Sequence, residues 1–208
     1  MSYTKTIAFI DAANIIYGAK KTAGFKVDLK KLANYLKTRF KTAKIYFYGG
    51  VNTKKIDFEK YYQLLKSFGF IPRLKKTKFY YQPGKIKTYI CRFCRRKNLI
   101  KERGKFRSKA NCDVDLSIDV LESLEKFNRF VFLTGDGDFE PLLIKAKKLN
   151  KEVYVIASSR KTAKNIKKAA AEKFVEIKSL EKIIAKKKEA TLLKSQPPVF
   201  VKNITHKK

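Results

Sequence analysis

Carboxylate side chains gather in three short stretches of this 208-residue chain. Six of its eight aspartates lie in FIDAAN, CDVDLSID and TGDGDF, and they are Asp11, Asp113, Asp115, Asp119, Asp136 and Asp138. Several carboxylates within a few ångström repel one another, and raised pKa values or hard cations relieve this repulsion. Oxygen ligands favour Mg2+ or Mn2+, which keep several waters and bind phosphate oxygens. Two such ions roughly 4 Å apart can activate water and stabilise the leaving oxygen in phosphodiester hydrolysis.

The rest of the chain is strongly basic. It has 50 Lys and Arg against 18 Asp and Glu, with a formal net charge of +32. This charge indicates a surface for nucleic acid or anionic membrane, or it serves only for solubility in a Lys-rich proteome. Lys outnumbers Arg, which favours phosphate attraction over bidentate base reading. The single histidine, His206, lies in the basic C-terminal stretch, and the chain has no P-loop, GxSxG or GxGxxG pattern.

Length and composition predict one folded domain followed by a tail. Hydrophobic residues make up 44% of the chain and aromatic residues 13%. We place the domain at residues 1–185 and a flexible basic tail at residues 186–208. The first apolar run is too short for a signal peptide, and no apolar stretch reaches 18 residues. We therefore expect a cytoplasmic protein that does not bind a membrane.

Apolar periodicity predicts alternating strands and helices. The expected strands are residues 7–10, 45–51, 70–71, 130–133 and 153–156, with a short segment at 174–177. The expected helices are residues 29–40, 58–68, 113–126 and 139–149, and one from about residue 162. Asp28 suits the N-cap of the first of these helices, and Gly69 suits the position after the second.

This alternation predicts the fold. Strands separated by helices form βαβ units with right-handed crossovers and a mainly parallel sheet. We expect a three-layer α/β/α sandwich, in which ligands bind beyond the carboxyl ends of the strands. Asp11 ends the first strand and Asp136 follows a later one. The two carboxylates should therefore share one cleft.

The three acidic stretches, taken together, resemble the motifs of the NYN domain family, the LabA-like or DUF88 branch of the PIN-like nuclease superfamily. The resemblance covers residues 7–177 in the family's order and spacing. It implies a PIN-like sheet and RNA cleavage that depends on Mg2+ or Mn2+. The implied catalytic residues are Asp11, Asp113 and Asp136, and the implied metal ligands are Asp11, Asp113, Asp119, Asp136 and Asp138. Asn14 would orient a ligand or contact phosphate, and Lys109 stands for the family's basic residue before the helix.

Four residues of the acidic stretches also have purely structural interpretations. Asp138 can cap the helix at residues 139–149, and Asn14 can cap a helix that starts at Ile15. Asp119 is either a ligand or a hydrogen-bond partner. Asp115 is either a surface residue or a partner of the ligands.

Residues 75–111 form a basic, cysteine-containing insertion, which we expect to be a hairpin. It can act as an arm that grips RNA, with Arg95 and Arg96 for phosphates and Tyr81 for stacking on unpaired bases. Alternatively, its basic and aromatic side chains simply cover the cleft. These are the expected substrate contacts beyond the acidic motifs.

The three cysteines suggest a possible structural zinc site. Cys91 and Cys94 have CxxC spacing, and with Cys112 they resemble a zinc ribbon that lacks its fourth cysteine. Asp115 stands where that fourth ligand is expected. Alternatively, Cys112 packs as a small apolar residue.

The leading functional hypothesis is a metal-dependent endoribonuclease acting on single-stranded or structured RNA. The alternative is a catalytically weak or inactive PIN-like module that binds RNA and regulates through partners. A Toprim-type nuclease would need a catalytic Glu at an earlier strand end, and haloacid-dehalogenase chemistry would need an acid where this chain has Ala13. Both are minor hypotheses.

Overall fold

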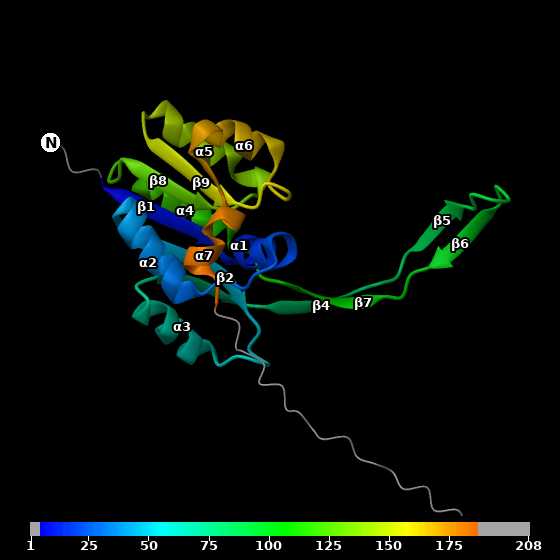
Figure 1. Cartoon of the computed structure of the whole chain (residues 1–208). Coiled ribbons are helices and arrows are strands. Elements are labelled where there is room, and N and C mark those ends of the chain that lie inside the picture. Colours follow the sequence, from blue (N-terminus) through cyan, green and yellow to red (C-terminus); the bar gives the residue numbers. More distant parts are fainter. Residues whose placement is uncertain (1–4, 187–208) are drawn as a thin grey trace, which may run out of the picture.

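The computed structural model describes residues 5–186 and centres on a six-stranded sheet. The strand order is β10-β9-β8-β1-β2-β3, and every neighbouring pair is parallel (Figure 1). These strands are β1 (Thr6–Asp11), β2 (Thr42–Val51), β3 (Ile71–Lys76), β8 (Arg129–Leu133), β9 (Glu152–Ala157) and β10 (Phe174–Glu176). The expected tail, apart from residue 186, lies outside the described residues.

Helices connect the strands. They are α1 (Ala12–Gly18), α2 (Leu29–Phe40), α3 (Phe58–Ser67), α4 (Asp113–Ser123), α5 (Glu140–Lys148), α6 (Lys164–Ala170) and α7 (Glu181–Ile184). Shorter helical segments are the π-helix η1 (Ala19–Ala23) and the 3-10 helices η2 (Gly137–Phe139), η3 (Ala171–Lys173) and η4 (Ile177–Leu180). Within residues 5–186, no helix has the length and apolar character needed to cross a bilayer.

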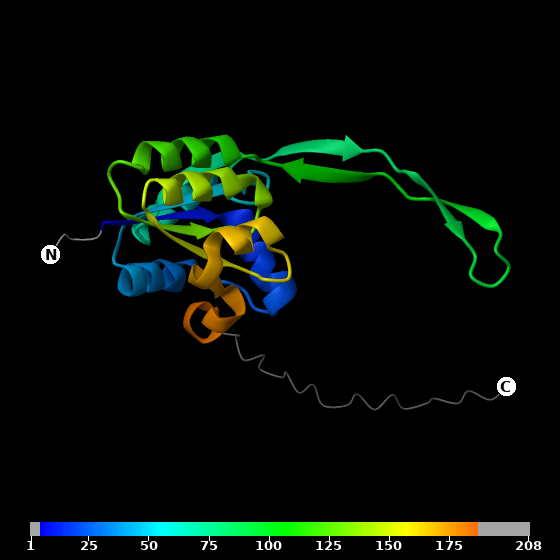
Figure 2. The same cartoon turned by 90° about the horizontal axis from the view of Figure 1, so that it is seen from above.

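The sheet has a hydrophobic core on each face, and the side chains of β1 point alternately into one core and the other, because successive residues of a strand point to opposite faces. Ala8 and Ile10 pack in one core with residues of α1, α2, α3 and α7. Ile7 and Phe9 pack in the other with residues of α4, α5 and α6. Figure 2 shows helices on both sides of the sheet. The predicted three-layer α/β/α sandwich is confirmed.

Helix caps match the predictions in two places and differ in two. Asp28 caps α2 by accepting a hydrogen bond from the amide of Lys31, 3.1 Å away, and Gly69 follows α3 with a φ of +89°. The first helix starts at Ala12 and is capped by Asp11, not by Asn14. Asp138 does not cap the helix after β8, because Asp136 caps η2 and α5 begins at Glu140.

The insertion is a long antiparallel hairpin, as expected, built from two successive ladders. The ladder next to the body pairs β4 (Lys78–Gln82) with β7 (Lys105–Lys109). The outer ladder pairs β5 (Ile86–Ile90) with β6 (Lys97–Lys101). Figures 1 and 2 show both ladders extending away from the body. We call residues 78–109 the arm.

Candidate active site at the carboxyl edge of the sheet

A pocket of about 360 Å³ lies where β1 and β2 end and α4 begins. Four aspartates line it: Asp11, Asp113, Asp136 and Asp138. They come from the three acidic stretches, which the fold brings together at the carboxyl edge of the sheet, where parallel sheets bind ligands. Lys109, the last residue of the arm, and Asn111, two residues after it, also line the pocket.

Asp11 is held in place by two neighbouring elements. One carboxylate oxygen accepts a hydrogen bond from the amide of Asn14, 3.1 Å away, and the other accepts one from Thr134 Oγ1 at 3.3 Å. The side-chain oxygen of Asn14 accepts a hydrogen bond from the amide of Gly135 at 3.0 Å. Asn14 therefore links α1 to the turn after β8, which fixes the aspartates of two motifs relative to each other.

The turn after β8 is close-packed and internally hydrogen-bonded. A Cβ at Gly135 would lie 2.6 Å from Thr162 Oγ1 and 3.0 Å from the Thr162 Cα, so only glycine fits there. The amide of Asp136 donates to Thr134 Oγ1 at 3.2 Å, and the amide of Asp138 donates to Asp136 Oδ1 at 3.1 Å. These contacts place both turn aspartates at the pocket.

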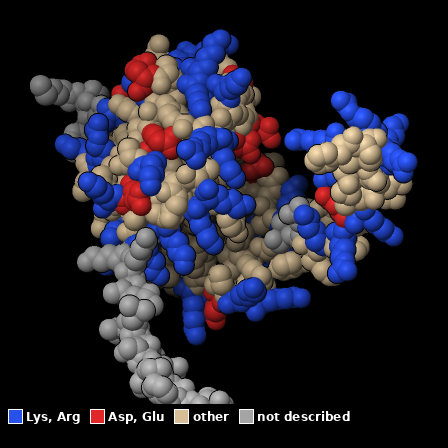
Figure 3. Space-filling model, turned by 45° about the vertical axis from the view of Figure 1, so that its right-hand side comes forward, with Lys and Arg blue, Asp and Glu red and all other residues tan. Residues whose placement is uncertain are grey.

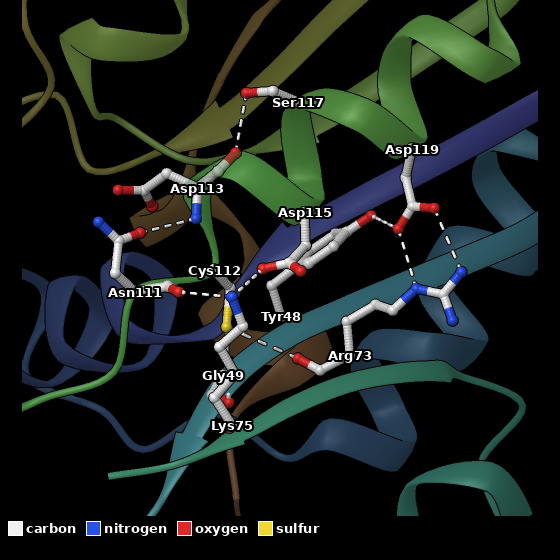
Figure 4. A network of polar contacts seen from close by, with 10 residues as sticks. All are labelled: Tyr48, Gly49, Arg73, Lys75, Asn111, Cys112, Asp113, Asp115, Ser117 and Asp119. Atoms are coloured by element: carbon white, nitrogen blue, oxygen red, sulfur yellow. Dashed lines mark hydrogen bonds and ion pairs between the residues drawn. The ribbon is translucent and has the colours of Figure 1, made fainter. Parts of the chain in front are cut away.

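Asp113 begins α4, and its backbone is fixed on both sides. Its amide donates to Asn111 Oδ1 at 2.8 Å, and its carbonyl accepts from Ser117 Oγ at 2.8 Å (Figure 4). A carboxylate in the first turn of a helix also lies at the positive end of the helix dipole. The stretch CDVDLSID thus delivers its first aspartate, Asp113, to the pocket.

The pocket aspartates perturb one another electrostatically. The pKa of Asp11 is raised, chiefly by burial and further by the charges of Asp113 and Asp136. The pKa of Asp113 is raised chiefly by burial and further by the charges of Asp136 and Asp138, whereas Lys109 opposes this rise. The four carboxylates are therefore close enough to disfavour their shared ionised state.

The described residues of the pocket do not offer a closed set of protein ligands for a metal ion. Among residues 5–186, no group of three or more His, Cys, Asp or Glu side chains is arranged to hold a metal ion. A hard cation needs fewer protein ligands than that, because Mg2+ usually keeps several waters and binds through one or two carboxylates. The oxygen-only donors and their mutual repulsion fit such an ion.

Asp119, expected among the ligands, makes a separate network. One of its carboxylate oxygens accepts from Tyr48 Oη at 2.8 Å and from Arg73 Nε at 3.0 Å. The other accepts from Arg73 Nη2 at 3.2 Å (Figure 4). Its side chain is only 10% exposed, and it does not line the acidic pocket. Neither partner was predicted from the sequence; the one available signal was an Arg within a Lys-rich strand, since the planar guanidinium suits a carboxylate.

Asp115 pairs with a cation of the neighbouring strand. It forms an ion pair with Lys75, whose Nζ also donates to the carbonyl of Asn111 at 3.0 Å (Figure 4). This contact joins β3 to α4 and to the segment that follows the arm. Asp115 does not line the acidic pocket.

A basic groove adjoins the acidic pocket at the base of the arm. This cavity of about 800 Å³ shares Lys109, Ala110 and Asn111 with the pocket. Its other lining residues are Lys75, Lys76, Lys78, Phe79 and Tyr80. Figure 3 shows Lys and Arg distributed across the visible face, with a group of acids at the side of the body that faces the arm. The acidic pocket thus opens onto a cationic and aromatic surface, whose extent was not predicted from the sequence.

The expected substrate contacts are divided between the pocket and the arm. Lys109 lines the pocket, whereas Asn14 does not line it and contacts Asp11 through its backbone amide. Tyr81 lies in β4, where it is exposed and packs edge-on against Phe106 with ring centroids 5.4 Å apart. Arg95 and Arg96 lie in the turn between β5 and β6. Tyr81, Arg95 and Arg96 are therefore not part of the acidic pocket, whereas Lys109, the last residue of the arm, is.

The three cysteines do not come together. Cys112 is buried in the body, with its sulfur 3.9 Å from the carbonyl oxygen of Gly49 and 3.8 Å from that of Arg73. Cys91 and Cys94 lie in the turn at the outer end of the arm. The expected set of Cys91, Cys94, Cys112 and Asp115 is thus separated, because the insertion projects outward instead of folding back on α4 (Figure 1).

Fold and site together define a PIN-like α/β protein with an acidic pocket at the carboxyl edge of its sheet. The chain belongs to the NYN domain family, whose model matches residues 5–180, and hence to the PIN-like nuclease superfamily. It is similar to the Low amplitude and bright protein LabA of Synechococcus elongatus, with 22% identity over 193 residues that cover 92% of this chain and 93% of LabA.

A solved structure shares the fold. It is the crystal structure of a protein of unknown function, VPA0982, from Vibrio parahaemolyticus, which is 22% identical and superimposes with a TM-score of 0.60. The match covers 85% of this chain and 95% of the other. This likeness supports the sheet and its helices.

Proposed function

We propose that this protein is a metal-dependent ribonuclease that hydrolyses RNA phosphodiester bonds at the acidic pocket. The observation that carries the proposal is the convergence of Asp11, Asp113, Asp136 and Asp138 on one pocket. In a protein with a net charge of +32, such a cluster is the exception to the prevailing charge. Membership of a PIN-like nuclease family supports hydrolysis as the reaction class.

The donor set fits Mg2+ or Mn2+. Asp11, Asp113, Asp136 and Asp138 offer carboxylate oxygens, which these cations prefer. Burial first, and then the charges of neighbouring aspartates, raise the pKa values of Asp11 and Asp113, and a bound cation would favour their ionised forms. When bound, such ions supply an activated water and charge stabilisation for the leaving oxygen. Both carboxylate oxygens of Asp119 accept hydrogen bonds from Tyr48 or Arg73. We therefore propose that Asp119 stabilises the packing of α4 against β2 and β3.

The chain's own residues orient the reacting groups. Asn14 and Thr134 hold the Asp11 carboxylate from opposite sides, and the turn amides hold Asp136 in place. Lys109 stands at the junction of the pocket and the basic groove, where its ammonium group can contact a phosphate beside the scissile one. Such fixed positions lower the cost of bringing phosphate and water together.

The basic groove supplies a path for a single strand. Lys76 and Lys78 offer charges for successive phosphates, and Phe79 and Tyr80 offer ring faces for unpaired bases. Because the groove shares three residues with the acidic pocket, a strand that follows it reaches the aspartates. Tyr81, Arg95 and Arg96 extend this path along the arm.

The proposal is tested by incubating the full chain with end-labelled single-stranded and hairpin RNA, and with matching DNA. Parallel reactions contain Mn2+, Mg2+ or a chelator. We expect cleavage only with a divalent ion, and products that carry 5′ phosphates. Binding without cleavage under every metal condition would instead support the RNA-binding regulatory module.

A further inference from the structure

The turn at the outer end of the arm brings together two thiols that are three positions apart in the sequence, Cys91 and Cys94. Cys91 and Cys94 are the first and last residues of a turn in which the amide of Arg95 donates to the Cys91 carbonyl at 3.0 Å. The Cys91 amide donates in turn to the Arg96 carbonyl at 2.9 Å. Arg95 takes a φ of +55°, a left-handed conformation that closes the turn directly after Cys94.

Backbone amides of this turn point at sulfur. The amides of Cys94 and Phe93 and the thiol of Cys94 donate hydrogen bonds to the sulfur of Cys91. Hydrogen bonds to sulfur favour the thiolate, which is the form that binds metals. Two cysteines at CxxC spacing on one turn are a common half of a tetrahedral Zn2+ site.

The described chain contains only half of such a site. A structural Zn2+ takes four ligands, whereas the third cysteine, Cys112, is buried in the body. Within residues 5–186, no third His, Cys, Asp or Glu joins Cys91 and Cys94 in a metal-holding group. Among residues 5–186, two of the four ligands that such a site needs are therefore missing.

The outer ladder also exposes apolar side chains that a partner could cover. A lone two-stranded hairpin is marginally stable in water. Phe93, between the two cysteines, is 98% exposed, and Ile86, Ile90 and Leu99 are exposed on the same ladder. Apolar side chains in this number, on an element remote from the core, mark an interaction surface.

We propose that Cys91 and Cys94 form half of a Zn2+ site that the same two cysteines of a second copy complete, so that two arms join tip to tip. Each thiol gives up its proton to solvent as its sulfur binds. Four thiolates and one Zn2+ together carry a net charge of about −2. Arg92, Arg95, Arg96 and Lys97 of each copy surround the turn and offset that charge. The inference is independent of the acidic pocket.

The test uses the full chain, purified with a reducing agent and dialysed against Zn2+. Elemental analysis and light scattering should give about 0.5 zinc per chain and twice the monomer mass. A chelator should reverse both. In the Cys91→Ser/Cys94→Ser double variant zinc and dimer should be lost, with body folding checked by circular dichroism. The matched Cys112→Ala variant should keep both, whereas a site that includes Cys112 would lose its zinc.

Cobalt gives a second readout on the unmodified protein. Co2+ in place of Zn2+ should produce thiolate-to-cobalt charge-transfer absorption together with the band pattern of tetrahedral coordination. Failure of the reduced protein to bind zinc, one zinc per monomer, or zinc binding unchanged in the double Ser variant would each overturn the proposal. The proposal would also be overturned if Cys91 and Cys94 formed a disulfide and the protein still bound no zinc after that disulfide was reduced.

Discussion

Asp11 is an acid that the fold keeps in an unfavourable environment. Burial is the main reason that its pKa is raised, and the charges of Asp113 and Asp136 add to the effect. As pH rises, the unfolded chain loses this proton before the folded chain does, so stability falls between the two pKa values. At neutral pH without a cation, the ionised Asp11 therefore lowers the free energy of unfolding.

Asp11→Asn should stabilise the cation-free protein. Asn is as good an N-cap as Asp, and its amide can donate to the Thr134 hydroxyl, so the hydrogen bonds of α1 persist. We expect the free energy of unfolding at neutral pH to rise by roughly 0.5–1 kcal/mol. Urea denaturation measures it, and the gain should shrink as pH falls through the raised pKa. A loss of stability at neutral pH would contradict this account of the pocket.

The hydrogen bonds of Asp119 should contribute more to the free energy of unfolding than the neighbouring Lys75–Asp115 ion pair does. Arg73→Met leaves a carboxylate that is 10% exposed with only Tyr48 as partner, and we expect a loss of about 1–3 kcal/mol. Lys75→Met is the matched control, because its pair with Asp115 also joins β3 to α4. The Asp115 side chain is 39% exposed, and exposed pairs contribute about 0–1 kcal/mol. Equal losses in the two variants, measured by urea denaturation, would contradict the assignment.

At the scale of elements, the body and the outer arm are nearly independent. The outer ladder pairs only with itself, and its strands contribute no residue to either core. The two strands next to the body lead from β3 to α4, and they place Lys109 and Asn111 at the acidic pocket. The inner ladder therefore belongs to the site, whereas the outer ladder extends it.

Deleting residues 84–103 should separate these roles. Pro83 and Gly104 then join the strands of the inner ladder. The deletion removes eight cations and one acid, which lowers the net charge by 7, from +32 to +25. We expect the thermal unfolding midpoint to change little, and RNA binding to weaken, with a salt slope reduced by about 0.7 for every phosphate that the shortened arm no longer binds. An unfolded product, or unchanged RNA affinity, would contradict this division.

Elements were more predictable from the sequence than their contacts. The apolar runs around Phe9 and Val131 and the helical spacing after Asp28 indicated a parallel sheet with helices on both faces. Glycine and aspartate at strand ends indicated the acidic pocket. Arg73 and Asp119 are 46 residues apart, and their pairing depends on β3 lying beside β2, which periodicity does not specify. The direction of the arm, which separates Cys91 from Cys112, likewise depends on hairpin pairing.

For the whole molecule, charge should dominate RNA affinity. A net charge of +32 spread over 208 residues attracts the phosphate backbone and releases its counterions on binding. With about six phosphate contacts to single-stranded RNA, affinity should fall roughly 300-fold between 50 and 200 mM salt, from a slope near 0.7 per contact. Fluorescence anisotropy measures this slope. A fall of less than about 10-fold would contradict an electrostatic mode of binding.

The molecule combines a positively charged surface with a negatively charged pocket. Under the proposed function, we expect the basic surface and arm to concentrate RNA, and the acidic pocket to repel phosphate until a cation offsets its aspartates. Binding and cleavage should therefore respond differently to loss of a pocket carboxylate: binding is carried by the lysines and arginines, whereas cleavage depends on the aspartates.

The most direct measurement compares RNA cleavage rates of the wild type, Asp136→Asn and the control Asp115→Asn in Mn2+, at matched RNA occupancy. Asn at position 136 can still accept the hydrogen bond from the Asp138 amide, so the turn is kept. We expect Asp136→Asn to bind RNA normally and cleave at least about 100-fold more slowly, since a metal centre supplies several kcal/mol, while Asp115→Asn stays near the wild-type rate. Equal cleavage rates for Asp136→Asn and wild type, or no cleavage by either despite normal binding, would contradict a catalytic metal centre at these aspartates.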